Sequence, residues 1–312
     1  MSSSQEKIDV VVCHYNKDQF PHLRFMALHT IAFLCKDHPA DLNVILVDGS
    51  PQRDDELAQG LTALGVEYLH CGRELSFAEA FNAGIKKTFS SVIVTVVNDV
   101  LIEAKQVRQL AEEIRDGIGC VFPYLSWDDY GAARTRRLRV PRRCFPNRMS
   151  FNSAAFSREA LVRVGLVPEK MTGCYNDVVL FIRLREEGYS IVLQNVGHVL
   201  HLAQQTLKTG ATSVSYKSDE LLFAKEYPQY WRNGVVLFHK AAQRWPTRII
   251  YQMVECLPAR FVEKLGIWNW VWAIEPYLCA EKGTYKECLI RLYKCFLLLN
   301  RGKKCPIPSL QK

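Results

Sequence analysis

The N-terminal part of the chain alternates short apolar runs with longer amphipathic stretches. Apolar, largely β-branched runs occupy residues 8–13, 43–47, 66–69 and 91–97, and their lengths are typical of buried strands. Between them, residues 21–35, 54–64 and 76–88 repeat apolar positions at helical spacing. Because strands that alternate with helices form βαβ units, the pattern predicts an α/β fold with a mainly parallel sheet flanked by helices.

Further along the chain this alternation continues and then stops. Residues 120–125 and 190–193 are expected to be strands, and helices are expected to open at Phe151 and near Asp177. From about Ser213 only helical patterns follow, at residues 219–226, at 227–244, from Trp245 onwards, at 258–272 and at 284–299. We therefore expect an α/β unit over residues 1–212 and a helical C-terminal extension over residues 213–312.

Composition and charge fit a folded, mildly basic protein. The chain has 312 residues and a formal net charge of +8. Its 11 cysteines are scattered without a CxxC pair, so we expect neither a zinc site nor a disulfide scaffold. Reduced thiols, no leader-like apolar core and no apolar run of membrane-spanning length together predict a cytoplasmic protein.

Polar residues follow three of the predicted strands. They are Tyr15-Asn16 after the first, Asp48-Gly49-Ser50 after the second, and Asn98-Asp99 after the strand at 91–97. Ligands of open α/β sheets bind at this carboxyl edge, although a lone Asp there is also a common turn or capping residue. The first turn has neither G-x-G-x-x-G nor a P-loop, which argues against a dinucleotide dehydrogenase or a P-loop kinase. Such side-chain-bearing turns suit hydrogen bonds to a base and a ribose.

Together with Ser76-Phe-Ala-Glu-Ala-Phe-Asn82-Ala-Gly84, these motifs resemble the successive motifs of family 2 glycosyltransferases of the GT-A fold. Rhamnosyltransferase and O-antigen members of that family are the most similar. The resemblance implies that a nucleotide-diphosphate sugar, with UDP, GDP or dTDP, is bound by Tyr15, Asn16, Asp48, Ser50, Asn82 and Asn98. It also implies Mn²⁺ or Mg²⁺ at Asp99, the last residue of the family's DxD motif. Val97 replaces the first Asp of that motif, so one carboxylate remains there.

The segment from Cys174 to Tyr189 is similar to the family's E-D-x-D-L-x-x-R-x-x-x-x-G-Y motif, and Asp177 falls on the position of the general base. An attacking acceptor hydroxyl must lose its proton, which a carboxylate can accept. An acid in the first turn of a helix is also favoured by the helix dipole, so a structural role stays open. Asn176 and Val179 replace two acids of the motif. His201 follows the last predicted strand, where the family places a metal-side His, and His198 is the alternative.

A basic segment without any acid runs from Gly131 to Arg158. Guanidinium groups suit phosphates and carboxylates, so we expect Arg136, Arg139, Arg142 and Arg143 to bind an anionic acceptor or membrane surface. A solvated surface loop is the plainer alternative. We expect no nucleic-acid partner, because no reader motif accompanies the arginines.

These features predict an inverting glycosyltransferase, hexosyl or deoxyhexosyl, that acts in polysaccharide biosynthesis on a glycan or lipid-linked acceptor. A catalytically degenerate module that binds nucleotide-sugar or scaffolds a glycan-assembly complex is the alternative. The C-terminal extension combines Trp268, Trp270 and Trp272 with a basic helix edge. It would pack on the catalytic unit or a second subunit, or dock peripherally on the cytosolic face of an anionic membrane.

Overall fold

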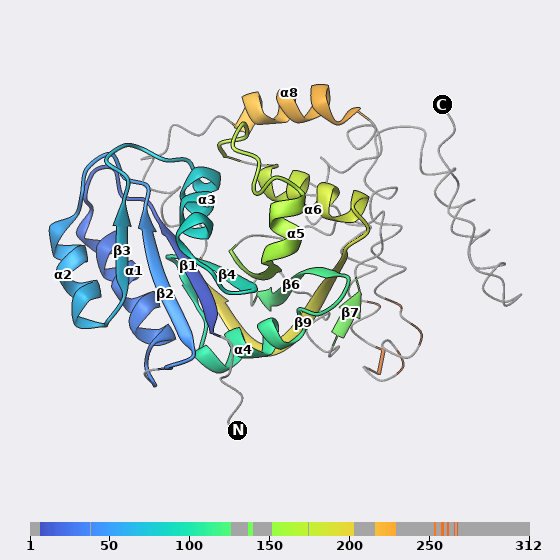
Figure 1. The fold of residues 1–312 in the computed structure, drawn as a ribbon, viewed down its shortest axis with the longest axis horizontal. Helices are drawn as coiled ribbons and strands as arrows, with labels where there is room; N and C mark the ends of the chain where they lie inside the picture. The colour runs from blue at the N-terminus through green and yellow to red at the C-terminus, as the bar shows by residue number, and fades with distance from the viewer. Residues whose placement is uncertain are drawn as a thin grey trace, which may run out of the picture.

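A computed structural model describes residues 7–37, 39–125, 137–139, 152–173, 175–202 and 216–228, with six single positions between 253 and 267. In these residues a nine-stranded sheet is packed between helices (Figure 1). The strands are β1 (Ile8–His14), β2 (Leu42–Asp48), β3 (Glu67–His70), β4 (Val92–Val97), β5 (Val100–Leu101), β6 (Ile118–Leu125), β7 (Arg137–Arg139), β8 (Ser153–Ser157) and β9 (Ser190–His201). The helices are α1 (Pro21–Leu34), α2 (Asp55–Ala63), α3 (Phe77–Lys87), α4 (Ala104–Glu112), α5 (Arg158–Arg163), α6 (Asn176–Glu186) and α8 (Tyr216–Glu226).

The strand order is β3-β2-β1-β4-β8-β6-β9-β5, with β7 added on β9. β3, β2, β1 and β4 run parallel, and β9 runs parallel to β6. β8 lies between β4 and β6 and is antiparallel to both. The predicted α/β fold is confirmed, and its sheet joins a parallel N-terminal half to a mixed C-terminal half.

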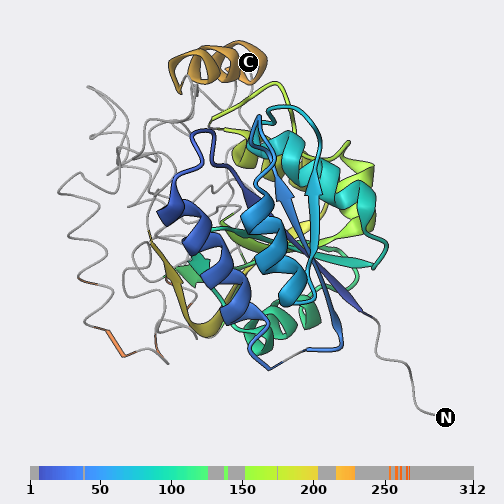
Figure 2. The same ribbon diagram turned by 90° about the vertical axis from the view of Figure 1, so that its left-hand side faces the viewer.

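Side chains of β1 alternate between two cores, as expected for a strand buried on both faces. Val10 and Val12 pack in the core under α1, α2 and α4, whereas Val11 and Cys13 face the core under α3, α5 and α6. Figure 2 shows α1 and α2 on one side of the sheet and α3 on the other. Gly84 lets α3 approach the sheet closely, because a Cβ there would meet Val11 Cγ1 at 2.3 Å. This packing explains the glycine of the Asn82-Ala-Gly84 motif.

Residues 153–157 correct one prediction. We expected a helix to open at Phe151, but Ser153–Ser157 form β8, and the helix α5 begins only at Arg158. Ala154, Ala155 and Phe156 are fully buried between two neighbouring strands. Tertiary pairing therefore overrides the helical propensity of the alanines. Ser157 does cap the helix, because its Oγ accepts from Ala160 N–H.

α8 packs on the α/β unit although it follows the predicted division at residue 212. Phe223 is fully buried in the same core as β1, α3 and α6. The other predicted helices of the extension lie almost entirely outside the described residues, so the division at residue 212 stays a prediction. No helix in the described part of the chain has both the length and the apolar character needed to cross a membrane.

Candidate functional site

Asp99 and His201, the two predicted metal ligands, lie side by side. Asp99 follows β4, and His201 ends β9 opposite Val100 in the short β5–β9 ladder. Asp99 Oδ1 is 3.3 Å from His201 Nε2, and only 7% and 5% of the two side chains are exposed. The backbone fixes the pairing, because Leu202 N–H donates to Asp99 O at 2.8 Å. The alternative residue, His198, also belongs to β9, and its side chain lies outside what the structure describes.

Asn152 holds the other side of the His201 ring. Its side-chain amide lies 3.3 Å from His201 Nδ1, and its carbonyl accepts from Val97 N–H at the end of β4. With Nδ2 as donor to Nδ1, the proton of His201 sits on Nε2 and points to Asp99. With the amide turned over, Oδ1 accepts from Nδ1–H, and the Nε2 lone pair becomes available to a metal ion. Asn152 can therefore support either form of the pair.

The chemistry of this pair fits a divalent ion that is completed by a ligand. A carboxylate oxygen and an imidazole nitrogen are donors that Mn²⁺ accepts. No group of three or more His, Cys, Asp or Glu suited to a metal occurs among the described residues. Asp99 and His201 would therefore hold the ion only together with other donors, such as phosphate oxygens and water.

Asp48 and Ser50, predicted nucleotide contacts, form a closed hydrogen-bond network. Asp48 is fully buried, and its Oδ1 accepts from Ser50 N–H at 2.9 Å and from the Ser50 hydroxyl. Its Oδ2 accepts from Tyr68 OH at 2.6 Å, and burial together with this bond raises the pKa of Tyr68. The Asp48 carboxylate is thus used inside the chain, where it fixes the turn after β2.

Asn16 extends the same network towards α1. Its N–H donates to Ser50 Oγ at 2.8 Å, and its side chain exchanges two hydrogen bonds with the backbone of Phe20. Tyr15 lies at the end of β1 and donates from its hydroxyl to Glu74. Burial, reinforced by Glu74, raises the pKa of Tyr15. These contacts order the loops around the predicted nucleotide site, and direct contacts of Tyr15 and Asn16 with a nucleotide stay predictions.

Asn98 lies beside a histidine that the sequence analysis did not select. Its Nδ2 is 2.9 Å from His14 Nδ1, and its carbonyl accepts from the Thr30 hydroxyl at 3.0 Å. His14 is 2% exposed, and its Nε2 has no hydrogen-bond partner within the described structure. Burial lowers the pKa of His14, although the nearby Asp48 acts in the opposite direction. A histidine at a strand end carries no signal by itself.

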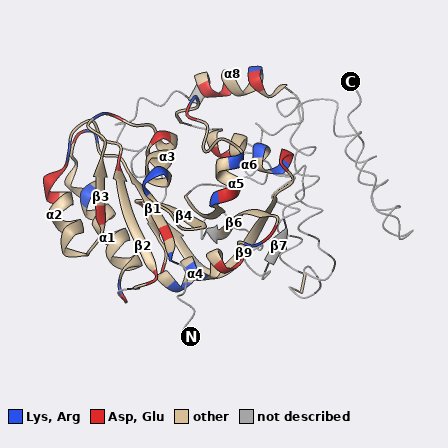
Figure 3. Cartoon of the chain, in the orientation of Figure 1, with Lys and Arg blue, Asp and Glu red and all other residues tan. Residues whose placement is uncertain are grey.

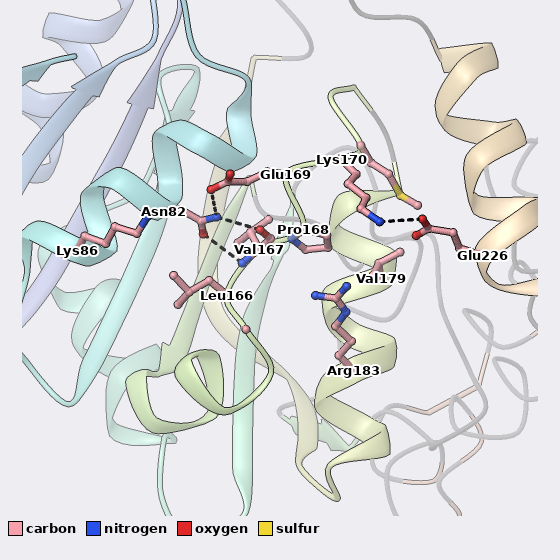
Figure 4. Close-up of a pocket in the computed structure, with 12 residues that line it drawn as sticks. Asn82, Lys86, Leu166, Val167, Pro168, Glu169, Lys170, Val179, Arg183 and Glu226 are labelled. Atoms are coloured by element: carbon pink, nitrogen blue, oxygen red, sulfur yellow. Dashed lines mark hydrogen bonds and ion pairs between the residues drawn. The ribbon is translucent and has the colours of Figure 1, made fainter.

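Asn82 anchors the turn after α5. Its Nδ2 donates to Val167 O at 2.9 Å and to Glu169 Oε1 at 2.8 Å, while Oδ1 accepts from Val167 N–H at 3.1 Å (Figure 4). The side chain is 3% exposed. Asn82 therefore binds a loop of the chain itself, and its predicted contact with a nucleotide would require one of these bonds to change.

Asp177, the predicted general base, lies half-buried in the first turn of α6. Its backbone N–H donates to Asn176 Oδ1 at 2.8 Å, and its own Oδ1 accepts from Val178 N–H at 2.7 Å. On the helix it shares the side of the buried Phe181 and Leu184.

A clamp from α8 holds the backbone that leads into Asp177. Asp219 is 3% exposed and accepts from Thr172 N–H at 3.3 Å and Gly173 N–H at 2.7 Å. Tyr175 caps α6 in the left-handed conformation, with φ of 65°, which is uncommon for a residue with a side chain. Its ring stacks on Phe223 with centroids 4.9 Å apart. No pattern in the sequence indicates this clamp.

The structure describes no side chain of the four arginines predicted to bind an anion. Arg136, Arg142 and Arg143 lie outside the described residues. Arg139 belongs to β7, where it is paired with Val192 of β9, and only its backbone is described.

Comparison with solved structures finds the same fold in several proteins. A mannosyltransferase from Pyrobaculum calidifontis, in complex with GDP-Man and Mn²⁺, matches with a TM-score of 0.51 and 17% identity over 95% of this chain and 81% of its own. Glucosyl-3-phosphoglycerate synthase from Mycobacterium tuberculosis, in complex with Mn²⁺, UDP and phosphoglyceric acid, matches at 0.51 and 16% over 70% and 78%. TarS 1-349 from S. aureus matches at 0.52 and 11% over 95% and 87%.

Sequence comparison assigns the family. Curated protein sequences gave no match. Residues 9–162 match the family described as Glycosyl transferase family 2. The matched segment runs from β1 to α5 and contains the turns after β1 and β2, the Asn82 helix, Asp99 and Asn152. This segment, on a fold of the GT-A type, therefore belongs to glycosyl transferase family 2.

Proposed function

We propose that the protein transfers a sugar from a nucleotide-diphosphate donor to a hydroxyl group of a glycan or lipid-linked acceptor, with inversion at the anomeric carbon. The observation that carries the proposal is the buried pair of Asp99 and His201, with Oδ1 and Nε2 3.3 Å apart. Such a pair, next to loops of a nucleotide-binding type of sheet, suits the diphosphate end of a donor. The two similar structures that contain Mn²⁺ with GDP-Man or UDP support the choice of ligand.

In this proposal each group has one task. A divalent ion held by Asp99 and His201 would neutralise the charge of the diphosphate leaving group. Asn152 orients His201 for that role through Nδ1. Asp177 accepts the proton of the acceptor hydroxyl as it attacks. One base and one displacement give inversion. The closed network of Asp48, Ser50 and Asn16 keeps the loops beside the donor in one conformation.

Donor binding and its metal dependence can be tested by thermal unfolding with UDP, GDP, dTDP and CMP, each with Mn²⁺ or with EDTA. A ligand that binds only the folded state stabilises it by about 2.7 kcal/mol at a hundred times its Kd. We expect one diphosphate to raise Tm, and this gain to vanish in EDTA and in Asp99→Ala. The exposed Asp116→Ala, in the turn before β6, is the matched control. A dTDP response would favour a deoxyhexosyl donor of the rhamnosyl kind. No response to any nucleotide would overturn the proposal.

A binding module without turnover is the second candidate, because Val97, Asn176 and Val179 stand where the resembled motifs have acids. Asp177→Asn separates the two. For an enzyme, we expect turnover to fall about 10²- to 10⁴-fold, with nucleotide affinity unchanged. Asp116→Asn removes the same charge at an exposed turn and should leave turnover as it is. Nucleotide binding without donor consumption in the unmodified protein would favour the module.

We also propose that the acceptor is anionic and that the protein meets it at the cytosolic face of a membrane. The support is the acid-free basic segment between Gly131 and Arg158, whose guanidinium groups suit a lipid-linked diphosphate or an anionic bilayer surface. Co-sedimentation with vesicles of phosphatidylglycerol, compared with phosphatidylcholine, tests this. Replacement of Arg136, Arg139, Arg142 and Arg143 by Gln should abolish any preference for the anionic lipid.

A further inference from the structure

A hollow of about 350 Å³ opens between α3 and α6, and neither Asp99 nor His201 lines it. Figure 4 shows its walls: Asn82 and Lys86 of α3 on one side, Val179 and Arg183 of α6 on the other, and the turn of residues 165–171 between them. Glu226 of α8 closes the far rim. Lys86 was not selected from the sequence, whereas Arg183 falls on the Arg of the resembled motif around Asp177. No step of the proposed transfer uses either residue.

The charges in this hollow do not balance. Lys170 is paired with Glu226 at 3.1 Å, and Glu169 accepts from the Asn82 amide at 2.8 Å. Within the described part of the chain, the side chains of Lys86 and Arg183 have neither an ion pair nor a hydrogen bond. Basic residues thus stand at the end of α3 and on α6, on both sides of the hollow (Figure 3). The two side chains offer one ammonium and one guanidinium group to the same space.

The floor of the hollow is rigid. Asn82 bonds both the N–H and the carbonyl of Val167. Gly165 and Leu166 follow α5 in left-handed conformations, with φ of 81° and 65°. The N–H of Leu166 returns to Leu161 O at 2.8 Å, which closes the end of the helix. A ligand would therefore meet a preorganised turn, with less ordering to be done on binding.

We propose that this hollow binds a small organic anion, a phosphate ester or a carboxylate, through Lys86 and Arg183. A guanidinium group presents paired donors to such anions, and an ammonium adds a compact positive charge. The volume lies at the lower end of small-molecule pockets. Leu166, Val167, Pro168 and Val179 supply apolar wall for a short carbon skeleton.

The cationic groups of the hollow lie apart from Asp177, although its wall includes Asn82, which is a predicted nucleotide contact. Arg183 follows Asp177 by nearly two turns of α6, which is about 9 Å along the axis and about 120° around it. Asp177 shares the inner side with Phe181 and Leu184, whereas Arg183 is on the solvent side with the exposed Glu186 and Glu187. A bound anion would thus act as an effector or hold a remote group of the acceptor, and the proposal does not depend on the transferase activity.

The test is calorimetric titration of the full chain at constant ionic strength with inorganic phosphate, glycerol 3-phosphate and lactate. EDTA and the Asp99→Ala background remove metal-assisted binding at the pair. We expect saturable binding, tighter for the ester than for inorganic phosphate. Lys86→Gln with Arg183→Gln should weaken it about tenfold or more. Lys87→Gln with Arg115→Gln removes the same charge from exposed positions that do not line the hollow, and should leave the affinity unchanged.

Two results would overturn the site. One is that the variant with Lys86→Gln and Arg183→Gln binds each of the three soluble anions as tightly as the parent does. That result would show nonspecific charge binding. The other is binding to phosphatidylglycerol vesicles that is lost in the hollow variant, without binding of any soluble anion, which would show a membrane contact. Thermal unfolding of each variant, with unchanged Tm as the criterion, ensures that a loss of binding is not a loss of folding.

Discussion

Two groups of polar residues follow strands of the same sheet, and they differ in the contacts that their carboxylates make. Asp48 accepts three hydrogen bonds from Ser50 and Tyr68 and is fully buried. Asp99 instead faces a histidine from a distant strand at 3.3 Å, in a pair that could open around an ion. In the sequence both are an Asp at the end of an apolar run. The difference shows that a polar residue at a strand end can either fix a loop or serve as a metal ligand. The residues that it contacts determine which of the two roles it has.

The largest effect should come from removing Asp48. Asp48→Ala leaves the Tyr68 hydroxyl and the Ser50 N–H and hydroxyl without their buried acceptor, so we expect a loss of about 2–4 kcal/mol in the free energy of unfolding. Asp99→Ala, an equal truncation at the same edge, should cost about 1 kcal/mol or less while it abolishes metal-dependent nucleotide binding. Urea unfolding measures both. Equal losses of stability in Asp48→Ala and Asp99→Ala would show that the two carboxylates do not differ in their structural role.

The next effect concerns Asn152. Asn152→Leu removes the amide beside His201 Nδ1, so we expect Mn²⁺ affinity in the presence of the nucleotide to fall about 10- to 100-fold. Asn152→Gln should recover part of it, because it keeps the amide. Asn43→Leu is the control, since its amide bonds to Asp9 at the other end of the sheet. Unchanged Mn²⁺ affinity in Asn152→Leu would show that the pair needs no support.

The clamp from α8 extends the comparison to the acceptor side. Asp219→Asn replaces a carboxylate that accepts from two backbone N–H groups, so we expect a loss of about 1–2 kcal/mol. Turnover should fall about tenfold with the donor KM unchanged, if the loop positions Asp177. Glu220→Gln, the neighbouring acid on the same helix, is the control. A rise in donor KM with normal kcat would instead connect the clamp with donor binding.

The smallest effect is a pH dependence at His14. Because burial lowers the pKa of His14, the unfolded chain binds the proton more readily than the folded one. The contribution of His14 is therefore complete above its unfolded pKa, about 6.5, and is lost as pH falls below that value, by at most about 1.4 kcal/mol per pH unit. His14→Gln should flatten this part of the stability profile, and the same replacement at the exposed His29 of α1 is the control. Identical stability profiles for the two variants would show that His14 does not contribute to the pH dependence of stability.

The N-terminal half of the fold follows closely from local sequence, and the C-terminal half does not. The strands and helices from Ile8 to Val97 lie within a residue or two of their predicted bounds, since apolar period and capping residues such as Ser76 are local signals. β8 was mistaken for helix because its alanines favour a helix and only their burial between β4 and β6 makes them a strand. β5 and β7 are too short to leave a pattern.

The candidate site was predictable in its residue types and less so in its contacts. The resemblance placed Asp99 and His201 at one site, and the structure brings them together. It could not show that the side-chain amides of Asn82 and Asn16 form hydrogen bonds with loops of the chain itself. Asn152, His14 and Asp219 were missed, because a single polar residue has no period or spacing. Each of them acquires its role only from a partner that is distant in sequence.

The β5–β9 ladder has a consequence for how the protein becomes active. β1 to β4 pair among neighbours that the ribosome delivers early, and their parallel sheet can assemble before β9 exists. The ladder that sets His201 against Asp99 joins segments far apart in the chain, and contacts of that kind close late because their loops are costly to close. A nascent chain would therefore order the loops after β1 and β2 long before Asp99 and His201 could bind a metal ion together. Nucleotide-dependent metal binding would report the last step of maturation.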